Sequence, residues 1–447
     1  MTPLNTTPLD AWIRRRIGCA PDSDFTRETV KRYQLGMLRQ SLAYAADHSP
    51  FYRRRLGGGL DFGELNLDAL ASLPFTTAED LCRDPLEFLC ISHQKVARVV
   101  TLRTSGTTGM PKRLFFAEED LEQTVDFFRH GMSTLVQAGQ RVLILMPGEL
   151  PGSVGDLLVK GLGCLGAEGI VHGPVRDPAD TIAEILAGRA DCLVGIPVQV
   201  LSLVRHPHGA RIPPGFIRSV LLSTDYVPDS MVQDIQRAWG CRVYQHYGMT
   251  EMGYGGGVEC DAHAGYHFRE ADLYVEIVDP LSGKPLPDGD PGELVFTTLN
   301  RRAMPLIRYR TGDIAGFLPE LCPCGSILQR LGKVQGRKSN TVALTPQIRL
   351  HMSMLDEALF AIPEILDFQV ELTAADGRSR LGVMLKCDAN GLSETICRVR
   401  KALAGVPAVR AAIAQGVLNI GPIRLGAAKW FTTGAAKRTF LDHRQEA

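Results

Sequence analysis

The chain has 447 residues, of which 49 are basic, 49 are acidic and 45% are hydrophobic. The length predicts two or three domains, the hydrophobic content excludes a disordered chain, and the balanced charge gives no basic surface for nucleic acid. The sequence contains neither an apolar run long enough to span a membrane nor a secretory signal at its start. We therefore expect a cytoplasmic protein that binds neither nucleic acid nor a membrane.

Residues 1 to about 95 have helical and loop-like patterns, and three glycines at 57–59 indicate a flexible connection. Short β-rich runs then alternate with helical stretches. The predicted strands cover residues 96–103, 141–148, 191–197, 217–225 and 241–248, and the clearest helices cover 177–190 and 228–240. This alternation predicts a parallel sheet, whose ligands bind beyond the carboxyl ends of the strands.

The pattern changes after this parallel region. Residues 271–279 and 292–299 are typical of antiparallel strands joined by a turn-rich segment. From about residue 339 a small α+β unit is predicted, with a helix at 351–362, strands at 367–374 and 380–387, and a helix at 393–405. We expect an α/β protein: a large N-terminal domain (1–337) with parallel sheets and a small β region, joined by a hinge to a small α+β C-terminal domain (338–447).

The most informative motif directly follows the first predicted strand and reads Thr104-Ser105-Gly106-Thr107-Thr108-Gly109-Met110-Pro111-Lys112. Its glycines let the backbone approach an anion, its hydroxyls can donate to phosphate oxygens, and its lysine adds a positive charge. The spacing is not that of a Walker loop, so an ordinary polar turn is the alternative. Gly161, Gly163 and Gly166 match a dinucleotide fingerprint in letters only, and we interpret them as a glycine-tolerant helix end.

Three further motifs follow in chain order: Tyr247-Gly248-Met249-Thr250-Glu251, Tyr309-Arg310-Thr311-Gly312-Asp313 and Gly336-Arg337. Together with residues 104–112 they resemble the adenylate-forming enzymes, and in particular the phenylacetate–coenzyme A ligase branch, from about residue 30 onward. The resemblance implies an AMP-forming acyl- or aryl-CoA ligase. Such an enzyme converts a small carboxylic acid and ATP to an acyl-adenylate, then passes the acyl group to coenzyme A (CoA). It also suggests a homodimer.

The resemblance assigns the phosphates of ATP to two of these motifs. The loop from Thr104 to Lys112 would cover the β and γ phosphates. Thr250 would contact the α-phosphate, and Glu251 would hold Mg²⁺, which bridges phosphate oxygens. On its own, Glu251 is better explained as a carboxylate that stabilises a helix start.

The nucleoside part of ATP is assigned in the same way. Tyr247, with Gly248 and Met249, would lie against adenine, and Ser223-Thr224-Asp225 would line the base. Asp313 would accept hydrogen bonds from the ribose hydroxyls, and Arg337 would reach the ribose or a phosphate. Asp313 alone is also explained as a turn residue before a strand.

The C-terminal region departs from the pattern of the family. Ala435 stands where a catalytic lysine is usual, and Lys437, two residues on, is the candidate to replace it. Ser339 occupies the hinge position, and Pro346 stands where a glycine would let pantetheine pass. These departures leave two alternatives: an adenylyltransferase-type enzyme that acts on a cofactor or protein without CoA, or a catalytically impaired nucleotide-binding homologue.

Four residues have the character of a structural zinc site: Cys260, His267, Cys322 and Cys324. Two thiols separated by one residue can face the same ion, and tetrahedral zinc prefers cysteine and histidine ligands. Members of the branch resembled here can carry zinc at this place. His263 competes with His267 for the nitrogen ligand, and the alternative is a group of reduced residues near a turn.

Overall fold

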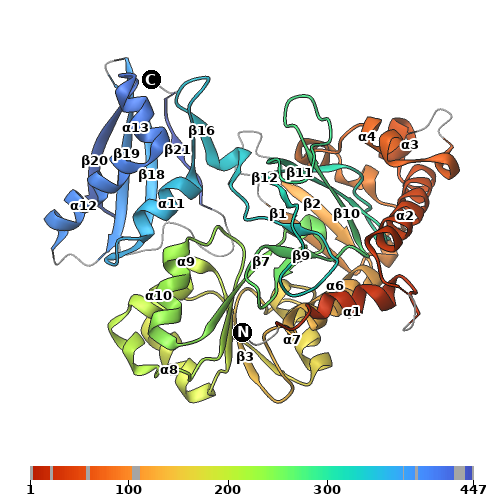
Figure 1. The fold of residues 1–447 in the computed structure, drawn as a ribbon, viewed down its shortest axis with the longest axis horizontal. Helices are drawn as coiled ribbons and strands as arrows, with labels where there is room; N and C mark the ends of the chain where they lie inside the picture. Colours follow the sequence, from red (N-terminus) through yellow and green to blue (C-terminus); the bar gives the residue numbers. More distant parts are fainter. Residues whose placement is uncertain are drawn as a thin grey trace. The chain divides into compact units, whose positions relative to one another are not determined.

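The computed structural model describes residues 4–20, 24–56, 61–102, 111–375, 377–387, 391–426 and 438–444 (Figure 1). The chain divides into two compact units. The first unit comprises Met1–Ala138, Leu150–Ala167 and His246–Val334, and the second comprises Gly139–Glu149, Glu168–Gln245 and Gln335–Ala447. The domain boundary at residue 338 stays a prediction, and the glycines at 57–59 lie outside the described residues.

The first unit contains most of the helices of the N-terminal half. They are α1 (Pro8–Arg16), α2 (Arg27–His48), α3 (Pro50–Leu56), α4 (Leu67–Ser72), α5 (Ala78–Arg83), α6 (Glu118–Met132) and α7 (Val154–Leu165). α2 begins after Thr26, whose hydroxyl accepts a hydrogen bond from the Thr29 N–H at 3.3 Å. α7 ends at Gly166, which has φ +80°, so the glycine-rich segment is a helix end, as predicted.

The strands of the first unit are antiparallel. They are β1 (Arg98–Leu102), β2 (Lys112–Phe116), β8 (Gly257–Glu259), β9 (Tyr266–Phe268), β10 (Leu273–Val278), β11 (Gly292–Thr298), β12 (Tyr309–Ala315), β13 (Phe317–Leu318) and β14 (Arg330–Leu331). The antiparallel pair expected at 271–279 and 292–299 is confirmed as β10 and β11. The expectation that residues 96–103 join the parallel series is wrong. β1 pairs with β2 as a hairpin, because the connection is shorter than the dozen or so residues a parallel crossover needs.

The second unit contains the predicted parallel sheet. Its strands lie in the order β4 (Glu168–Val171), β3 (Arg141–Leu145), β5 (Cys192–Gly195), β6 (Ser219–Leu222) and β7 (Arg242–Tyr247). The unit boundary falls inside β7, whose last two residues pair with β8 in the first unit. The helices of this sheet are α8 (Pro178–Gly188), α9 (Pro197–Arg205) and α10 (Asp229–Trp239). The expected strands and the helices at 177–190 and 228–240 are thus confirmed.

The second unit also contains the C-terminal α+β region, which follows β15 (Gly336–Arg337) and the short hairpin of β16 (Thr341–Ala343) and β17 (Arg349–His351). Its elements are α11 (Met352–Phe360), β18 (Ile365–Ala375), β19 (Arg378–Cys387), α12 (Leu392–Gly405), α13 (Pro407–Ala414), β20 (Leu418–Leu425) and β21 (Leu441–Asp442). The strand order is β20-β19-β18-β21, with β18 and β19 antiparallel. The predicted helices and strands of this region are confirmed. β20 and β21 were not predicted.

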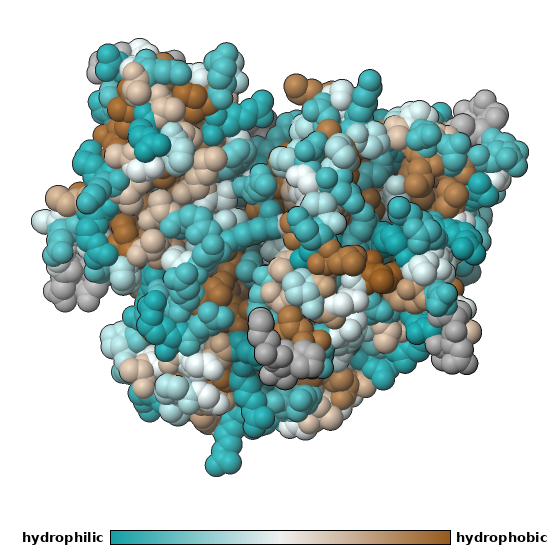
Figure 2. Space-filling view, in the orientation of Figure 1, coloured by the Kyte–Doolittle hydropathy of each residue, from teal (hydrophilic) through white to brown (hydrophobic). Residues whose placement is uncertain are grey.

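Hydrophilic residues cover much of the face drawn in Figure 2, and hydrophobic residues are scattered among them. Within the part of the chain that the structure describes, no helix combines the length and apolar character needed to cross a bilayer.

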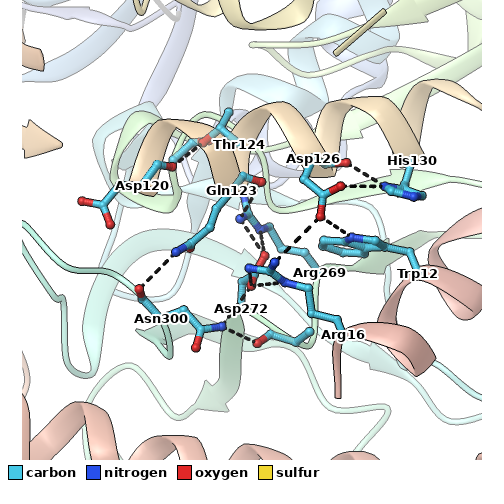
Figure 3. A network of polar contacts seen from close by, with 12 residues as sticks. Trp12, Arg16, Asp120, Gln123, Thr124, Asp126, His130, Arg269, Asp272 and Asn300 are labelled. Carbon is cyan, nitrogen blue, oxygen red and sulfur yellow. Dashed lines mark hydrogen bonds and ion pairs between the residues drawn. The ribbon is translucent and has the colours of Figure 1, made fainter. Parts of the chain in front are cut away.

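A polar network in the first unit joins α1 and α6 to the segment around β10 (Figure 3). Asp126 of α6 accepts from Trp12 Nε1 at 2.7 Å, and Asp272 accepts from Arg16 and Arg269 at 3.0 and 2.7 Å. Burial raises the pKa of Asp272, but these guanidinium groups lower it by more, so the net shift is downward. α6 also reaches the turn after Glu251, where the Thr124 hydroxyl donates to Gly253 O at 3.0 Å. The network therefore fixes the helix that supports this turn.

Candidate active site

Lys112, Glu251 and Tyr309 meet inside the first unit. Lys112 begins β2, Glu251 lies in the 3₁₀ turn Thr250–Met252, and Tyr309 begins β12. Lys112 Nζ forms an ion pair with Glu251 and lies 3.3 Å from Tyr309 Oη, which donates to Glu251 Oε1 at 3.1 Å. Lys112 and Glu251 are only 9% and 4% exposed. A buried carboxylate needs a cation beside it, so Glu251 occupies a cation-binding position.

Tyr247 and Asp313 form a second contact in the same unit. Tyr247 ends β7, and its hydroxyl donates to Asp313 Oδ2 in β12 at 2.7 Å. Both side chains are buried. Gly312, before Asp313, has φ +74°, a conformation that favours glycine and explains its place in the motif. One carboxylate oxygen of Asp313 is thus oriented by the tyrosine.

The backbone between Tyr247 and Glu251 is tightly packed. A Cβ atom on Gly248 would lie 2.7 Å from Tyr254 O, so only glycine fits there. Beyond Met249, the Thr250 carbonyl accepts from the Gly253 N–H at 3.0 Å, and Gly253 has φ +77°. This turn holds the Glu251 side chain toward Lys112.

The other predicted nucleotide-binding residues of the described chain belong to the second unit. Ser223, Thr224 and Asp225 follow β6, and Thr224 has φ +88°, which is rare for a β-branched residue. Asp225 accepts from the Tyr226 N–H at 2.9 Å and from Arg438 Nε at 3.3 Å. Arg337 lies in β15, where its carbonyl accepts from the Thr341 hydroxyl at 2.6 Å.

Several predictions fall on residues that the structure does not describe. Thr104, Ser105, Gly106, Thr107, Thr108 and Gly109 lie outside the described residues, as do Ala435 and Lys437. Pro346 is described and lies exposed in the turn between β16 and β17.

Arg438, the residue after Lys437, was missed by the sequence analysis. It is buried, with Nη2 2.7 Å from Asp356 Oδ1 and Nε 3.3 Å from Asp225 Oδ2, and its guanidinium lies over the rings of Phe360 and Phe368. Burial raises the pKa of Asp356 to about 8, although Arg438 opposes this shift. Arg438 therefore anchors the chain directly after the predicted catalytic lysine. The only signal in the sequence is an arginine adjacent to that lysine.

The four predicted metal ligands lie together in the first unit. Cys260 follows β8, His267 lies in β9, and the turn Cys322-Pro323-Cys324-Gly325 closes with a hydrogen bond from Gly325 N to Cys322 O at 2.9 Å. The ligand atoms all lie within 4.8 Å of one another, and all four residues are buried. His263 is not part of this group; its Nδ1 lies 3.6 Å from Glu259 Oε2.

The distances within this group match a tetrahedral ion. Cys260 Sγ lies 3.6 Å from Cys322 Sγ, and Cys324 Sγ lies 3.6 Å from His267 Nε2. Bond lengths of about 2.3 Å to sulfur and about 2.05 Å to nitrogen give tetrahedral separations of roughly 3.8 and 3.6 Å.

The cysteines and the histidine of this group shift one another's pKa values. A hydrogen bond from Cys260 lowers the pKa of Cys324, although burial opposes this, and the same hydrogen bond raises the pKa of Cys260. Burial lowers the pKa of His267, but the two neighbouring cysteines raise it by more, to about 9. The lowered pKa of Cys324 favours its thiolate, which is the form that binds metal.

Comparison with known proteins agrees with this geometry. The family model described as AMP-binding enzyme matches residues 97–300. A phenylacetate–coenzyme A ligase of Thermus thermophilus is 30% identical, over 76% of this chain and 77% of its own length. The chain belongs to the phenylacetate–coenzyme A ligase family. An Escherichia coli relative of the same name is 26% identical, over 82% of this chain and 85% of its own.

Solved structures show the same fold. A 2-hydroxyisobutyryl-CoA ligase with a bound acyl-AMP has a TM-score of 0.78 at 20% identity, covering 96% of this chain and 95% of that one. ATP-bound MatB from Rhodopseudomonas palustris has a TM-score of 0.54 at 17% identity, covering 78% and 68%. The α/β fold and the AMP-forming acyl-CoA ligase activity predicted from the sequence are therefore confirmed. Neither the adenylyltransferase nor the impaired homologue is favoured.

Proposed function

We propose that this ligase activates a small aryl or aliphatic carboxylic acid with Mg²⁺ and ATP, and then transfers the acyl group to CoA. Phenylacetate is the first acid to test, because the Thermus thermophilus and Escherichia coli relatives are named for it. The buried group of Lys112, Glu251 and Tyr309 is the observation that carries this proposal, because it joins the ends of three motifs through a single carboxylate.

The chemistry requires a carboxylate to attack the α-phosphorus of ATP, so the protein must align two anions and disperse their charge. Glu251 would hold Mg²⁺. Its buried carboxylate already pairs with the Lys112 ammonium, so a cation fits at this position. When bound, Mg²⁺ neutralises phosphate charge. Lys112 and the loop Thr104–Gly109 would bind the β and γ phosphates, and Thr250 the α-phosphate.

The hydrogen-bonded pair of Tyr247 and Asp313 would hold the nucleoside. Tyr247, with Gly248 and Met249, would lie against adenine. Asp313 would accept hydrogen bonds from the ribose hydroxyls. The Tyr247 hydroxyl, which donates to Asp313, would keep the carboxylate of Asp313 oriented. We retain Ser223, Thr224, Asp225 and Arg337 as further nucleotide-binding residues.

Lys437 would approach the carboxylate and the α-phosphate during adenylation, in place of the lysine that Ala435 replaces. Its neighbour Arg438 is anchored to two aspartates, which supports a defined end for the segment that carries Lys437. The rate at which the Lys437→Ala variant exchanges pyrophosphate into ATP tests this role. A rate equal to that of the wild type would exclude it.

Zn²⁺ would bind Cys260, His267, Cys322 and Cys324 as a structural ion. Four protein ligands leave no open position for a substrate. The metal would therefore contribute stability to the first unit and take no part in the reaction.

Exchange of pyrophosphate into ATP, followed by mass spectrometry of the product with CoA, tests the proposal. We expect exchange that depends on the acid, and an acyl-CoA with release of AMP. An AMP-bearing product without a thioester would favour the adenylyltransferase, and absence of exchange with every aryl and aliphatic acid would contradict the proposal. A cytoplasmic location, a homodimer, and the lack of nucleic-acid and membrane binding stay predictions; light scattering of the purified protein tests the dimer.

A further inference from the structure

Arg301 differs from the other buried arginines of the first unit. Arg308 pairs with Glu276 at 2.9 Å, Arg269 pairs with Asp272 at 2.7 Å, and Arg330 donates to two backbone carbonyls. Arg301 is only 8% exposed. Among the described residues it donates no hydrogen bond and forms no ion pair. A buried guanidinium that always keeps its charge is costly without an anion.

The two carboxylates that interact electrostatically with Arg301, Asp120 and Glu251, are already held by other groups. Asp120 accepts the backbone N–H groups of Ala117, Arg302 and Ala303 at 2.9, 2.7 and 3.0 Å. Glu251 is held by Lys112 and Tyr309. Burial lowers the pKa of Arg301, while Asp120 and Glu251 raise it by less. The described residues thus supply no free anion for this cation.

Packing fixes Arg301 beside the turn that carries Glu251. Its Cζ lies 4.9 Å from the centre of the Phe116 ring, at the end of the strand that Lys112 begins. A Cβ atom on Gly253 would come 2.9 Å from Arg301 Nη2, so the side chain lies directly against the backbone two residues after Glu251. The guanidinium is therefore positioned before any ligand binds.

We infer that Arg301 binds an oxyanion group of a substrate next to Glu251, a role that rests on the proposed ligase function. A guanidinium donates two parallel hydrogen bonds equally well to phosphate and to carboxylate. In this reaction the oxyanion belongs either to the polyphosphate of ATP or to the carboxylic acid. Proximity to Glu251 and to the strand of Lys112 favours the polyphosphate.

Three variants test this inference. Arg301→Met removes the charge and keeps an apolar chain for Phe116, and Arg301→Lys keeps the charge without the planar fork. Arg302→Met is the matched control, because Arg302 is the exposed neighbour. Affinities for MgATP, pyrophosphate, AMP and the acid are measured by calorimetry, and the melting temperature is measured without ligand.

We expect Arg301→Met to melt at the wild-type temperature or above, because it removes an uncompensated buried charge. Its affinity for MgATP and pyrophosphate should fall by about tenfold or more, with AMP and acid binding unchanged, since a charged hydrogen bond is lost. Arg301→Lys should be intermediate, and Arg302→Met should match the wild type. Loss of acid affinity alone would identify the carboxylate as the oxyanion.

A lower melting temperature in both Arg301 variants, with wild-type affinity for all four ligands, would overturn the inference and make Arg301 a purely structural residue. If the wild-type protein bound neither ATP nor AMP, the proposed function itself would fail, and this inference with it. The two failures are distinguishable, because the first leaves nucleotide binding intact.

Discussion

Two segments to which we assign a role in the proposed reaction each precede a buried cation, one in each unit. Lys112 lies two positions after residue 110, at the end of the segment 103–110, and Arg438 directly follows residues 427–437. Lys112 pairs with one carboxylate, Glu251, whereas Arg438 contacts two aspartates and lies over two phenylalanine rings. A single flexible ammonium can be exchanged for a metal ion, while a stacked guanidinium with two partners is a permanent anchor. We therefore interpret Lys112 as part of a binding site and Arg438 as a structural residue.

The cluster of Cys260, His267, Cys322 and Cys324 extends this comparison to a proposed metal site. Replacing Cys322 and Cys324 by serine should remove bound zinc and lower the free energy of unfolding by more than about 5 kcal/mol. Metal analysis and urea denaturation check this expectation. Cys164→Ser with Cys397→Ser is the control, since both of these cysteines are exposed. Equal zinc in the two double variants would remove the assignment.

Arg438→Met should lower the free energy of unfolding by about 3 to 5 kcal/mol, because half-buried Asp225 and buried Asp356 would lose their hydrogen-bonding cation, and the stacking of the guanidinium on two phenylalanine rings would be lost. Urea denaturation measures this loss. The matched control is Arg424→Met, at an exposed position of β20. Equal stability of the two variants would mean that Arg438 is not an anchor.

Glu251→Gln should reduce pyrophosphate exchange by about a hundredfold, because the position for the metal ion loses its charge. The rate is measured at saturating MgATP and acid. Glu119→Gln removes an exposed carboxylate of α6 and should leave the rate unchanged. A Glu251 variant as active as this control would contradict the exchange of Lys112 for a metal.

The raised pKa of Asp356 predicts that the stability of the protein depends on pH. Its pKa is raised to about 8 in the folded protein, above the usual value of 3.8. The folded state therefore binds one proton more than the unfolded state between these values, and stability falls as the pH rises through this window, by at most about 1.4 kcal/mol per unit. Asp356→Asn stays neutral and should weaken this dependence. Denaturation at pH 5.5 and pH 8 measures the difference, and parallel curves for the two proteins would refute it.

Local patterns in the sequence predicted most of the fold. Alternating apolar strands and amphipathic helices led to the parallel sheet, and the Cys322-Pro-Cys324 spacing led to the cluster with Cys260. The error at residues 96–103 arose because an apolar run does not reveal its partner strand, and only the short connection to β2 makes it a hairpin. The choice between His263 and His267 could not be made by spacing, because both lie within reach of Cys260 in sequence.

The site was predicted less completely, because long-range contacts have no local signal. Tyr309 was recognised only as part of a motif, and its contact with Glu251 depends on how β12 meets the 3₁₀ turn. Arg301 and Arg438 look like ordinary charged residues in the sequence. What makes them unusual is burial, together with the partners that each one has or lacks.

The pairing of β21 with β18 has a consequence for the order of folding. β18 precedes its neighbour β21 by more than sixty residues, and Arg438 reaches Asp225 across 213 positions of sequence. On the ribosome, the parallel sheet can be complete while Asp225 still lacks its cation and the C-terminal sheet still has an open edge. The ion pair of Asp225 with Arg438 and the pairing of β18 with β21 can both be complete only after residue 442 has emerged. A nascent chain that stalls before residue 438 should therefore be degraded or aggregate more readily than a chain that has passed residue 442.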